Sequence, residues 1–124
     1  MPNMRNNLEI ASPSLVPDPP VDRAHLSRMT LGDRGLEGEV LRLFGRQVDM
    51  LLERMASAEP GCIKALAHTL DGSARGIGAF RVSQAAQDVE RAVTAGGDVG
   101  AAIDLLKAAA DEALAAIADL LRVH

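Results

Sequence analysis

A histidine on the outer side of a predicted helix is the residue of this sequence best placed to do chemistry. The helix around it has apolar residues at three- and four-residue steps, which lie on one face: Ile63, Leu66, Ala67, Leu70, Ala74 and Ile77. At 3.6 residues per turn, His68 lies roughly 140° from the middle of that face, so we expect its imidazole to face solvent. Gly72, one turn further on, lies on the same outer side and has no side chain to crowd the ring. This arrangement indicates a group that another macromolecule must reach.

Helical segments with short connections are expected to position this histidine. The sequence predicts helices over residues 22–31, 33–58, 60–78, 79–94 and 98–122. Asp22, Asp33 and Asp98 stand where they can cap helix N-termini, and Pro60 is well tolerated in the first turn of a helix. Four long helices joined in this way predict an all-α, antiparallel four-helix bundle, with the short N-terminal helix covering one end.

The inward faces of the other long helices follow from the same periodicity. The expected core positions are Leu36, Val40, Leu41, Phe44, Val48, Leu51, Leu52, Met55, Phe80, Val82, Ala86, Val89, Val93, Ile103, Leu106, Ala110, Leu114, Ile117 and Leu121. Residues 1–20 are rich in proline, which disfavours helix, so we expect a flexible N-terminal tail there. Residues 21–124 then form a single bundle domain.

Composition excludes several classes of function. The net charge of −4 and the pI of about 5.3 do not fit a nucleic-acid-binding protein. Cys62 is the single cysteine, which precludes an intramolecular disulfide and suits a reducing compartment. The sequence has no apolar run long enough for a membrane span and no secretory signal, so we expect a cytoplasmic protein. Nothing in the sequence demands a dimer, and a monomer is expected.

The residues around His68 resemble the motif of a known family. The pattern His-x-Leu-Lys-Gly-Ser, followed by Gly-Ala about ten residues after the histidine, is typical of HPt (histidine-containing phosphotransfer) domains. This sequence matches the pattern at His68, Leu70, Gly72, Ser73, Gly78 and Ala79. Val89-Glu90 also falls where the family usually has Leu-Glu, and Asp71 replaces the family's lysine. The resemblance covers roughly residues 21–122, and HPt domains share the bundle architecture predicted from periodicity.

The resemblance implies a carrier function for His68 in a two-component phosphorelay. A phosphoryl group would pass between the receiver domain of a hybrid histidine kinase and that of a response regulator. The receiver supplies the aspartate and the Mg²⁺ of the reaction centre, so this chain is expected to need no cofactor and not to be an enzyme. Histidine suits such a carrier because its unperturbed pKa leaves much of the ring unprotonated at cell pH. Phosphoryl transfer itself depends on in-line approach and charge neutralisation.

Charged neighbours of His68 are candidates for the surroundings of the phosphoryl group. Lys64 and Arg75 lie within about 40° of His68 around the helix and can reach a group on the imidazole, although both also fit ordinary solvated charges. Asp71 either favours the imidazolium and opposes an added dianion or accepts a hydrogen bond from a ring nitrogen. We expect the lost lysine charge to lower the standing level of phosphohistidine.

The next helix and the surface around His68 provide the remaining candidate residues. Gln84 and Gln87 either approach His68 or belong to a polar outer face. A receiver domain, whose active-site pocket is acidic, would dock on a shallow and locally basic surface made by Gly61, Lys64, Ala65, Gly72 and Arg75.

Other functions remain open at this level. The chain could instead be a docking module that binds a receiver or a kinase without being phosphorylated, and Asp71 favours this alternative. It could also be a detached phosphoacceptor or dimerisation domain of a kinase, although the boxes of an ATP-binding domain are missing. A metal site is not expected, because the Glu-x-x-His pairs of di-iron bundles do not occur.

Overall fold

The computed structural model describes residues 19–123, and over that range the chain forms helices and no strand. The helices are α2 (Arg23–Met29), α3 (Arg34–Met55), α4 (Pro60–Ile77), α5 (Phe80–Ala95) and α6 (Val99–Arg122). The all-α prediction is therefore confirmed, and the long helices begin and end within a few residues of the expected positions. The tail predicted for residues 1–20 lies outside the described residues as far as residue 18.

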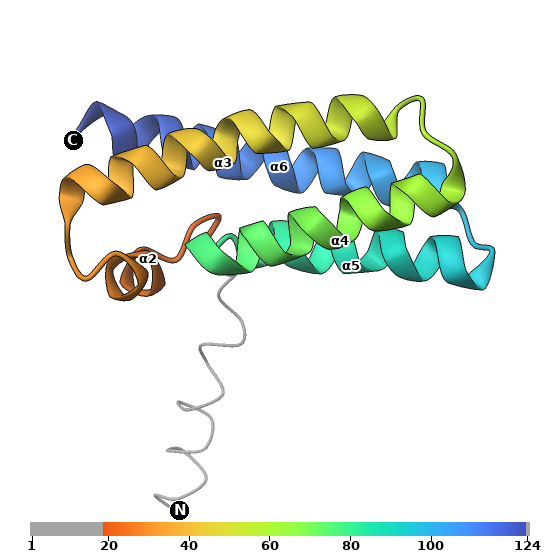
Figure 1. Cartoon of the computed structure of the whole chain (residues 1–124), viewed down its shortest axis with the longest axis horizontal. Helices are drawn as coiled ribbons and strands as arrows, with labels where there is room; N and C mark the ends of the chain where they lie inside the picture. The colour runs from red at the N-terminus through yellow and green to blue at the C-terminus, as the bar shows by residue number, and fades with distance from the viewer. Residues whose placement is uncertain (1–18, 124) are drawn as a thin grey trace, which may run out of the picture.

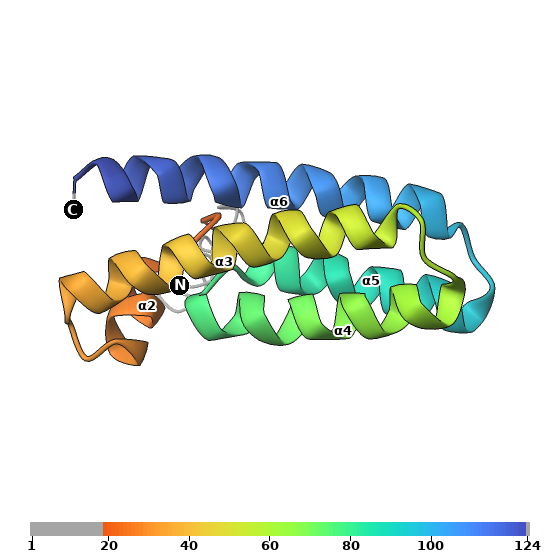
Figure 2. The same ribbon diagram turned by 45° about the horizontal axis from the view of Figure 1, so that its top comes forward.

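The four long helices run antiparallel to their neighbours along the chain and form one bundle (Figures 1 and 2). The helix that carries His68, α4, packs mainly against α5 and also against α3, whereas α6 packs against α5 and α3. The short helix α2 lies at one end of the bundle and contacts α4. Within residues 19–123, no helix is both long and apolar enough to cross a bilayer.

Local signals in the sequence explain where the helices begin. The carboxylates of Asp22, Asp33 and Asp98 accept hydrogen bonds from backbone N–H groups three residues on, at 2.9 to 3.1 Å, as N-caps do. Gly78 ends α4 in the left-handed conformation, with φ of 84°. Its carbonyl accepts a hydrogen bond of 2.9 Å from the Asp22 amide, which fixes the entry to α2 beside the end of α4.

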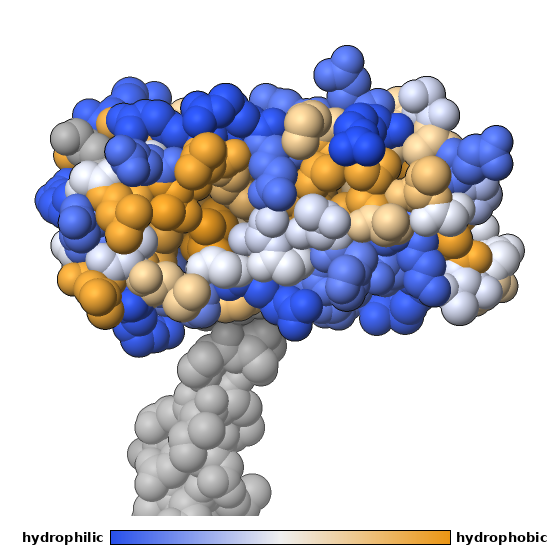
Figure 3. Space-filling view, viewed as in Figure 1, coloured by the Kyte–Doolittle hydropathy of each residue, from blue (hydrophilic) through white to orange (hydrophobic). Residues whose placement is uncertain are grey.

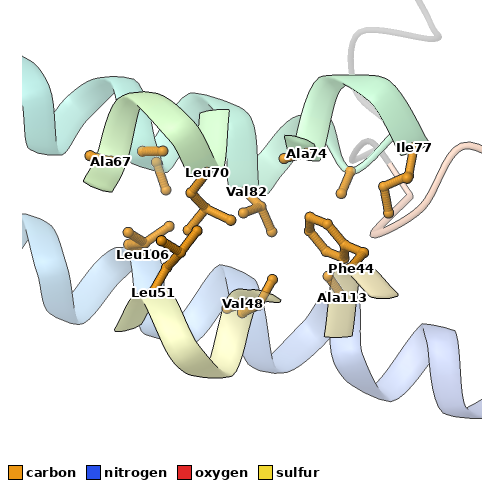
Figure 4. Close-up of a cluster of buried hydrophobic side chains, with 14 of the residues drawn as sticks. Phe44, Val48, Leu51, Ala67, Leu70, Ala74, Ile77, Val82, Leu106 and Ala113 are labelled. Carbon is orange, nitrogen blue, oxygen red and sulfur yellow. The ribbon is translucent and has the colours of Figure 1, made fainter. Parts of the chain in front are cut away.

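The core lies between the apolar faces of the four long helices, and Figure 4 shows a central part of it. Leucine, valine and alanine dominate, and the residues with no exposed surface include Leu41, Val48, Ala67, Leu70, Val82, Val89 and Leu106. This tight packing makes α4 a rigid support for the residues on its outer side.

The prediction that Leu36 and Phe80 lie in the core was wrong. Leu36 is 43% exposed, because it shares the outer face of α3 with Leu43 and Met50 at seven-residue spacing. Phe80 is 36% exposed at the first position of α5, where its ring meets that of His25 edge-on at 5.1 Å between centroids. Phe80 therefore packs at the end of the bundle and contributes little to its centre.

Candidate functional site

His68 projects from α4 into solvent. The six residues of the apolar stripe predicted for this helix are all buried, and the His68 side chain on the opposite side is 73% exposed. Gly72 is exposed on the same helix, and a Cβ added there would meet no atom within 4 Å. The imidazole is therefore accessible to a partner and sits on a helix held firmly by its other face.

Glu90 on α5 contacts the imidazole directly. Its Oε1 lies 3.2 Å from Nδ1 of His68, and the Glu90 side chain is only 20% exposed. A carboxylate at neutral pH can only accept hydrogen bonds, so Nδ1 must carry the proton and donate it. The neutral ring then keeps its lone pair on Nε2, which is left free on the side away from Glu90. Glu90 thus determines which nitrogen of the neutral ring keeps its lone pair.

This contact was missed from the sequence, where Glu90 served only as part of a motif match. Its neighbour Val89 is fully buried against the core of the bundle, which places Glu90 at the edge of α5. The distance to His68 depends on how α4 and α5 are aligned along their axes, and a single sequence does not give that alignment. The signal available in the sequence was the Val89-Glu90 pair itself.

Asp71 is buried at the seam between α4 and α5, with a relative exposure of 4%. Its Oδ1 accepts hydrogen bonds from Ser83 Oγ at 2.5 Å and from Gln87 Nε2 at 3.2 Å, and its Oδ2 accepts one from Arg75 Nη2 at 3.1 Å. Burial by itself raises the pKa of this carboxyl group. The hydrogen bonds and the positive charges of Arg75 and of protonated His68 outweigh burial, and the net effect is a lowered pKa.

The other residues predicted to surround His68 form no hydrogen bond with its imidazole in the structure. Gln84 donates a hydrogen bond to Asp88 at 3.3 Å and Gln87 donates to Asp71, so neither makes the direct contact with His68 that we had considered. The partner of the imidazole is Glu90, not Asp71. Lys64 is exposed and forms no ion pair with any residue between 19 and 123.

The surface expected to receive a partner is open. All five of its residues are exposed, namely Gly61, Lys64, Ala65, Gly72 and Arg75. A Cβ at Gly61, as at Gly72, would meet nothing within 4 Å, so the surface beside the histidine is shallow. Figure 3 shows apolar patches on the face of the molecule formed by α3 and α4. Leu43 and Met50 are among the exposed apolar residues of α3.

Three side chains of metal-ligand type meet at this site. Ligand atoms of His68, Asp71 and Glu90 all lie within 4.8 Å of one another. Both oxygens of Asp71 already accept hydrogen bonds, one of them from a guanidinium, and a guanidinium repels a cation. The arrangement is thus suited to hold an imidazole and an arginine, and the positive charge of Arg75 opposes a metal ion at Asp71.

Comparison with known proteins agrees with this geometry. The model of the Hpt domain family matches residues 39–122. The fold is similar to the crystal structure of the histidine phosphotransferase ShpA from Caulobacter crescentus, with a TM-score of 0.63 and 32% sequence identity over 80% of this chain and 88% of that one. A comparison with curated proteins gave no match. Because the family match covers most of the helical bundle, the chain belongs to the Hpt domain family.

Proposed function

We propose that His68 carries a phosphoryl group between receiver domains of a hybrid histidine kinase and a response regulator. The observation that carries this assignment is an exposed imidazole, on a rigid helix of an Hpt domain, whose Nδ1 is held by Glu90. The hydrogen bond fixes both the orientation of the ring and the nitrogen that is free to react. Phosphorelay carriage is the role that Hpt domains perform, and the partners named here are our inference from it.

The transfer balances with the groups that the site offers. The lone pair of His68 Nε2 attacks the phosphorus of an aspartyl phosphate, an N–P bond forms, and the O–P bond breaks to release the aspartate carboxylate. Since Nδ1 keeps its proton, the phosphorylated ring carries positive charge, and the Glu90 carboxylate at 3.2 Å stabilises that charge as it develops. In the second half of the relay an aspartate oxygen attacks the phosphorus and the electron pair returns to Nε2.

The partner supplies what this chain lacks for the reaction. We infer that the Mg²⁺ and the reacting aspartate both belong to the receiver domain, so this chain acts as a carrier and not as an enzyme in its own right. The exposed and shallow surface around His68 supports brief contact with more than one receiver, and modest affinity is expected of a relay that must release each of them. We further propose that the chain works in the cytoplasm as a monomer.

Phosphorylation of defined variants tests the proposal. The purified chain is incubated with a receiver domain labelled on its aspartate, and the label on this chain is followed over time. We expect an acid-labile, alkali-stable label that is absent from His68→Ala and present in His25→Ala, which removes a histidine from a different part of the bundle. Label that persists in His68→Ala would place the phosphoryl group elsewhere and refute the assignment.

The surroundings of His68 also support a second function, a docking module that is not phosphorylated. Two carboxylates, Asp71 and Glu90, lie within 4.8 Å of the imidazole, and negative charge opposes the arrival of a phosphoryl dianion. Under this alternative, the chain binds cognate receivers with the same affinity in wild type and in His68→Ala, and no labelled receiver transfers its phosphoryl group. The experiment above therefore separates the two functions.

A further inference from the structure

We propose that Asp71 is a positioning residue that anchors Arg75, and that the Arg75 guanidinium is the cation that faces a phosphoryl group on His68. The inference rests on the proposed phosphoryl carriage by His68. It explains how this chain works with a carboxylate at the position where the family motif has a lysine.

The geometry of α4 brings Arg75 back toward His68. Arg75 is seven residues beyond the histidine, about two turns along the helix and on nearly the same side. Its Nη2 donates a hydrogen bond of 3.1 Å to Oδ2 of Asp71, which lies one turn closer to His68. An Asp71 ligand atom is within 4.8 Å of a ring nitrogen of His68. The arginine side chain is thus folded back along the helix to Asp71, whose carboxylate is the group between it and the imidazole.

Hydrogen bonds from α5 hold the Asp71 carboxylate in place. Ser83 and Gln87, both on α5, donate hydrogen bonds to Oδ1, and Asp71 and Ser83 are buried at the α4–α5 seam while Gln87 is half-buried. Oδ2 is therefore held in one direction and presents its acceptor to the guanidinium. A planar guanidinium held in this way loses little further freedom when it binds phosphoryl oxygens, which is the advantage of arginine over lysine in such sites.

The pairing also changes the electrostatic effect of Asp71 on His68. An unpaired carboxylate beside the histidine would oppose the added dianion, but the negative charge of Asp71 is compensated by Arg75 and by two hydrogen-bond donors. Arg75 is 57% exposed, so its remaining N–H groups are open to a ligand. Lys64 lies on the same side of α4 but has no partner among the described residues to hold it near the ring.

Phosphorylation rates of three variants test this assignment. The rate is measured with a phosphorylated receiver domain and, separately, with phosphoramidate, a small phosphoryl donor that needs no docking surface. We expect Arg75→Ala to slow phosphorylation by about tenfold with both donors, the effect of one charge-assisted hydrogen bond. Asp71→Asn, which keeps an oxygen for Ser83 and Gln87 but offers an N–H to Arg75, should slow it by a similar factor. With phosphoramidate, which does not use the docking surface, Lys64→Ala should change the rate less than twofold.

Matched controls separate positioning from stability. Arg122→Ala removes an arginine that pairs with Asp119 on α6, a helix that packs on α3 and α5, and should leave the rate unchanged. Adding Asp71→Asn to Arg75→Ala should slow the reaction no further, because Asp71 acts through Arg75. An additional loss in the double variant, or a faster reaction in Asp71→Asn, would overturn the inference. So would a loss in Arg75→Ala that appears only with the receiver, since Arg75 would then be a docking residue.

A measurement on the unaltered protein gives an independent check. The Nε–H resonance of Arg75 should shift when the wild-type chain is phosphorylated, while that of Arg122 stays in place. A resonance of Arg75 that does not respond would overturn the inference even if Asp71→Asn failed to fold. If the wild-type chain is not labelled at His68 at all, it is the proposed function that fails. If it is labelled and Arg75→Ala reacts as fast as wild type, only this inference fails.

Discussion

The contact between Glu90 and His68 gives a prediction whose size follows from the structure. A hydrogen bond to a charged acceptor contributes about 1.5–3 kcal/mol when it is shielded from water. The His68 ring is 73% exposed while Glu90 is 20% exposed, so solvent screens much of this interaction and about 1 kcal/mol is a reasonable value. That free energy corresponds to about a fivefold change in an equilibrium constant. Glu90→Ala should therefore shift the ratio of the two neutral tautomers of His68 about fivefold toward the Nε2–H form.

Nitrogen NMR of the imidazole measures this ratio directly. At neutral pH, the wild-type chain should show a protonated Nδ1 and an Nε2 with a free lone pair. Phosphorylation of Glu90→Ala should slow by a comparable factor of about five, because fewer molecules present a nucleophilic Nε2 and the charge on the phosphorylated ring is no longer stabilised. Glu90→Gln keeps an acceptor oxygen but no charge, so its tautomer ratio and its phosphorylation rate should lie between those of wild type and Glu90→Ala.

A carboxylate removed elsewhere provides the control for this prediction. Asp119→Ala on α6 deletes an acidic group that pairs with Arg122 and should alter neither the tautomer ratio nor the rate. If Glu90→Ala keeps the wild-type tautomer ratio, the hydrogen bond does not select the nitrogen and the reasoning is refuted. If the ratio shifts while the phosphorylation rate stays constant, Nε2 is not the reacting atom.

Three further predictions concern access, acid stability and the end of α4. Gly72→Arg should cut transfer from a receiver more than tenfold, because the new side chain at this exposed position blocks a partner. The free energy of unfolding should change by no more than about 1 kcal/mol in denaturant titrations, because a Cβ at residue 72 would meet no atom within 4 Å. Normal transfer would show that the gap is not needed. Because the pKa of Asp71 is lowered by folding, its stabilising contribution is present above the unfolded-state value of 3.8 and is lost as pH falls through the folded-state pKa. The free energy of unfolding should therefore fall more steeply with acid in wild type than in Asp71→Asn. Equal slopes would contradict this. Gly78→Ala should lower the free energy of unfolding, measured by urea denaturation, by about 2 kcal/mol. The reason is that φ is 84° and the added Cβ would lie 2.9 Å from the Asp22 carbonyl oxygen. A smaller loss than in Gly72→Ala would be inconsistent with this strain.

Helix boundaries were predictable because the signals for them are local. Asp22, Asp33 and Asp98 each cap the helix that follows, as expected from their position before an apolar periodic run. Glycine at residue 78 ends α4 for a reason that the sequence also carries, namely its tolerance of the left-handed conformation. The exposure of Leu36 also follows from the sequence. Leu36 lies five residues before the buried Leu41, which puts it roughly 140° around the helix from Leu41 and directs it away from the core.

The polar contacts between helices were not predictable in the same way. Asp71 lies roughly 90° from the middle of the apolar face of α4, an edge position whose burial depends on what the neighbouring helix places there. The structure places Ser83 and Gln87 beside it, and Glu90 beside His68. Sequence periodicity gives the direction in which each side chain leaves its own helix, but not how far the two helices slide past each other.

The packing of α4 against α5 therefore positions both His68 and Asp71. On its outer edge the seam between the two helices brings Glu90 to the imidazole, and in its interior it brings Ser83 and Gln87 to Asp71. Both contacts depend on one alignment of the two helices, which their shared apolar faces and the turn at Gly78 maintain. Because hydrogen bonds fail with shifts that a packed core still tolerates, a small slide of α5 would disturb the histidine site well before the bundle unfolds. The replacement of a lysine by Asp71 is consistent with this arrangement, since only a carboxylate can accept from Ser83, Gln87 and Arg75 together.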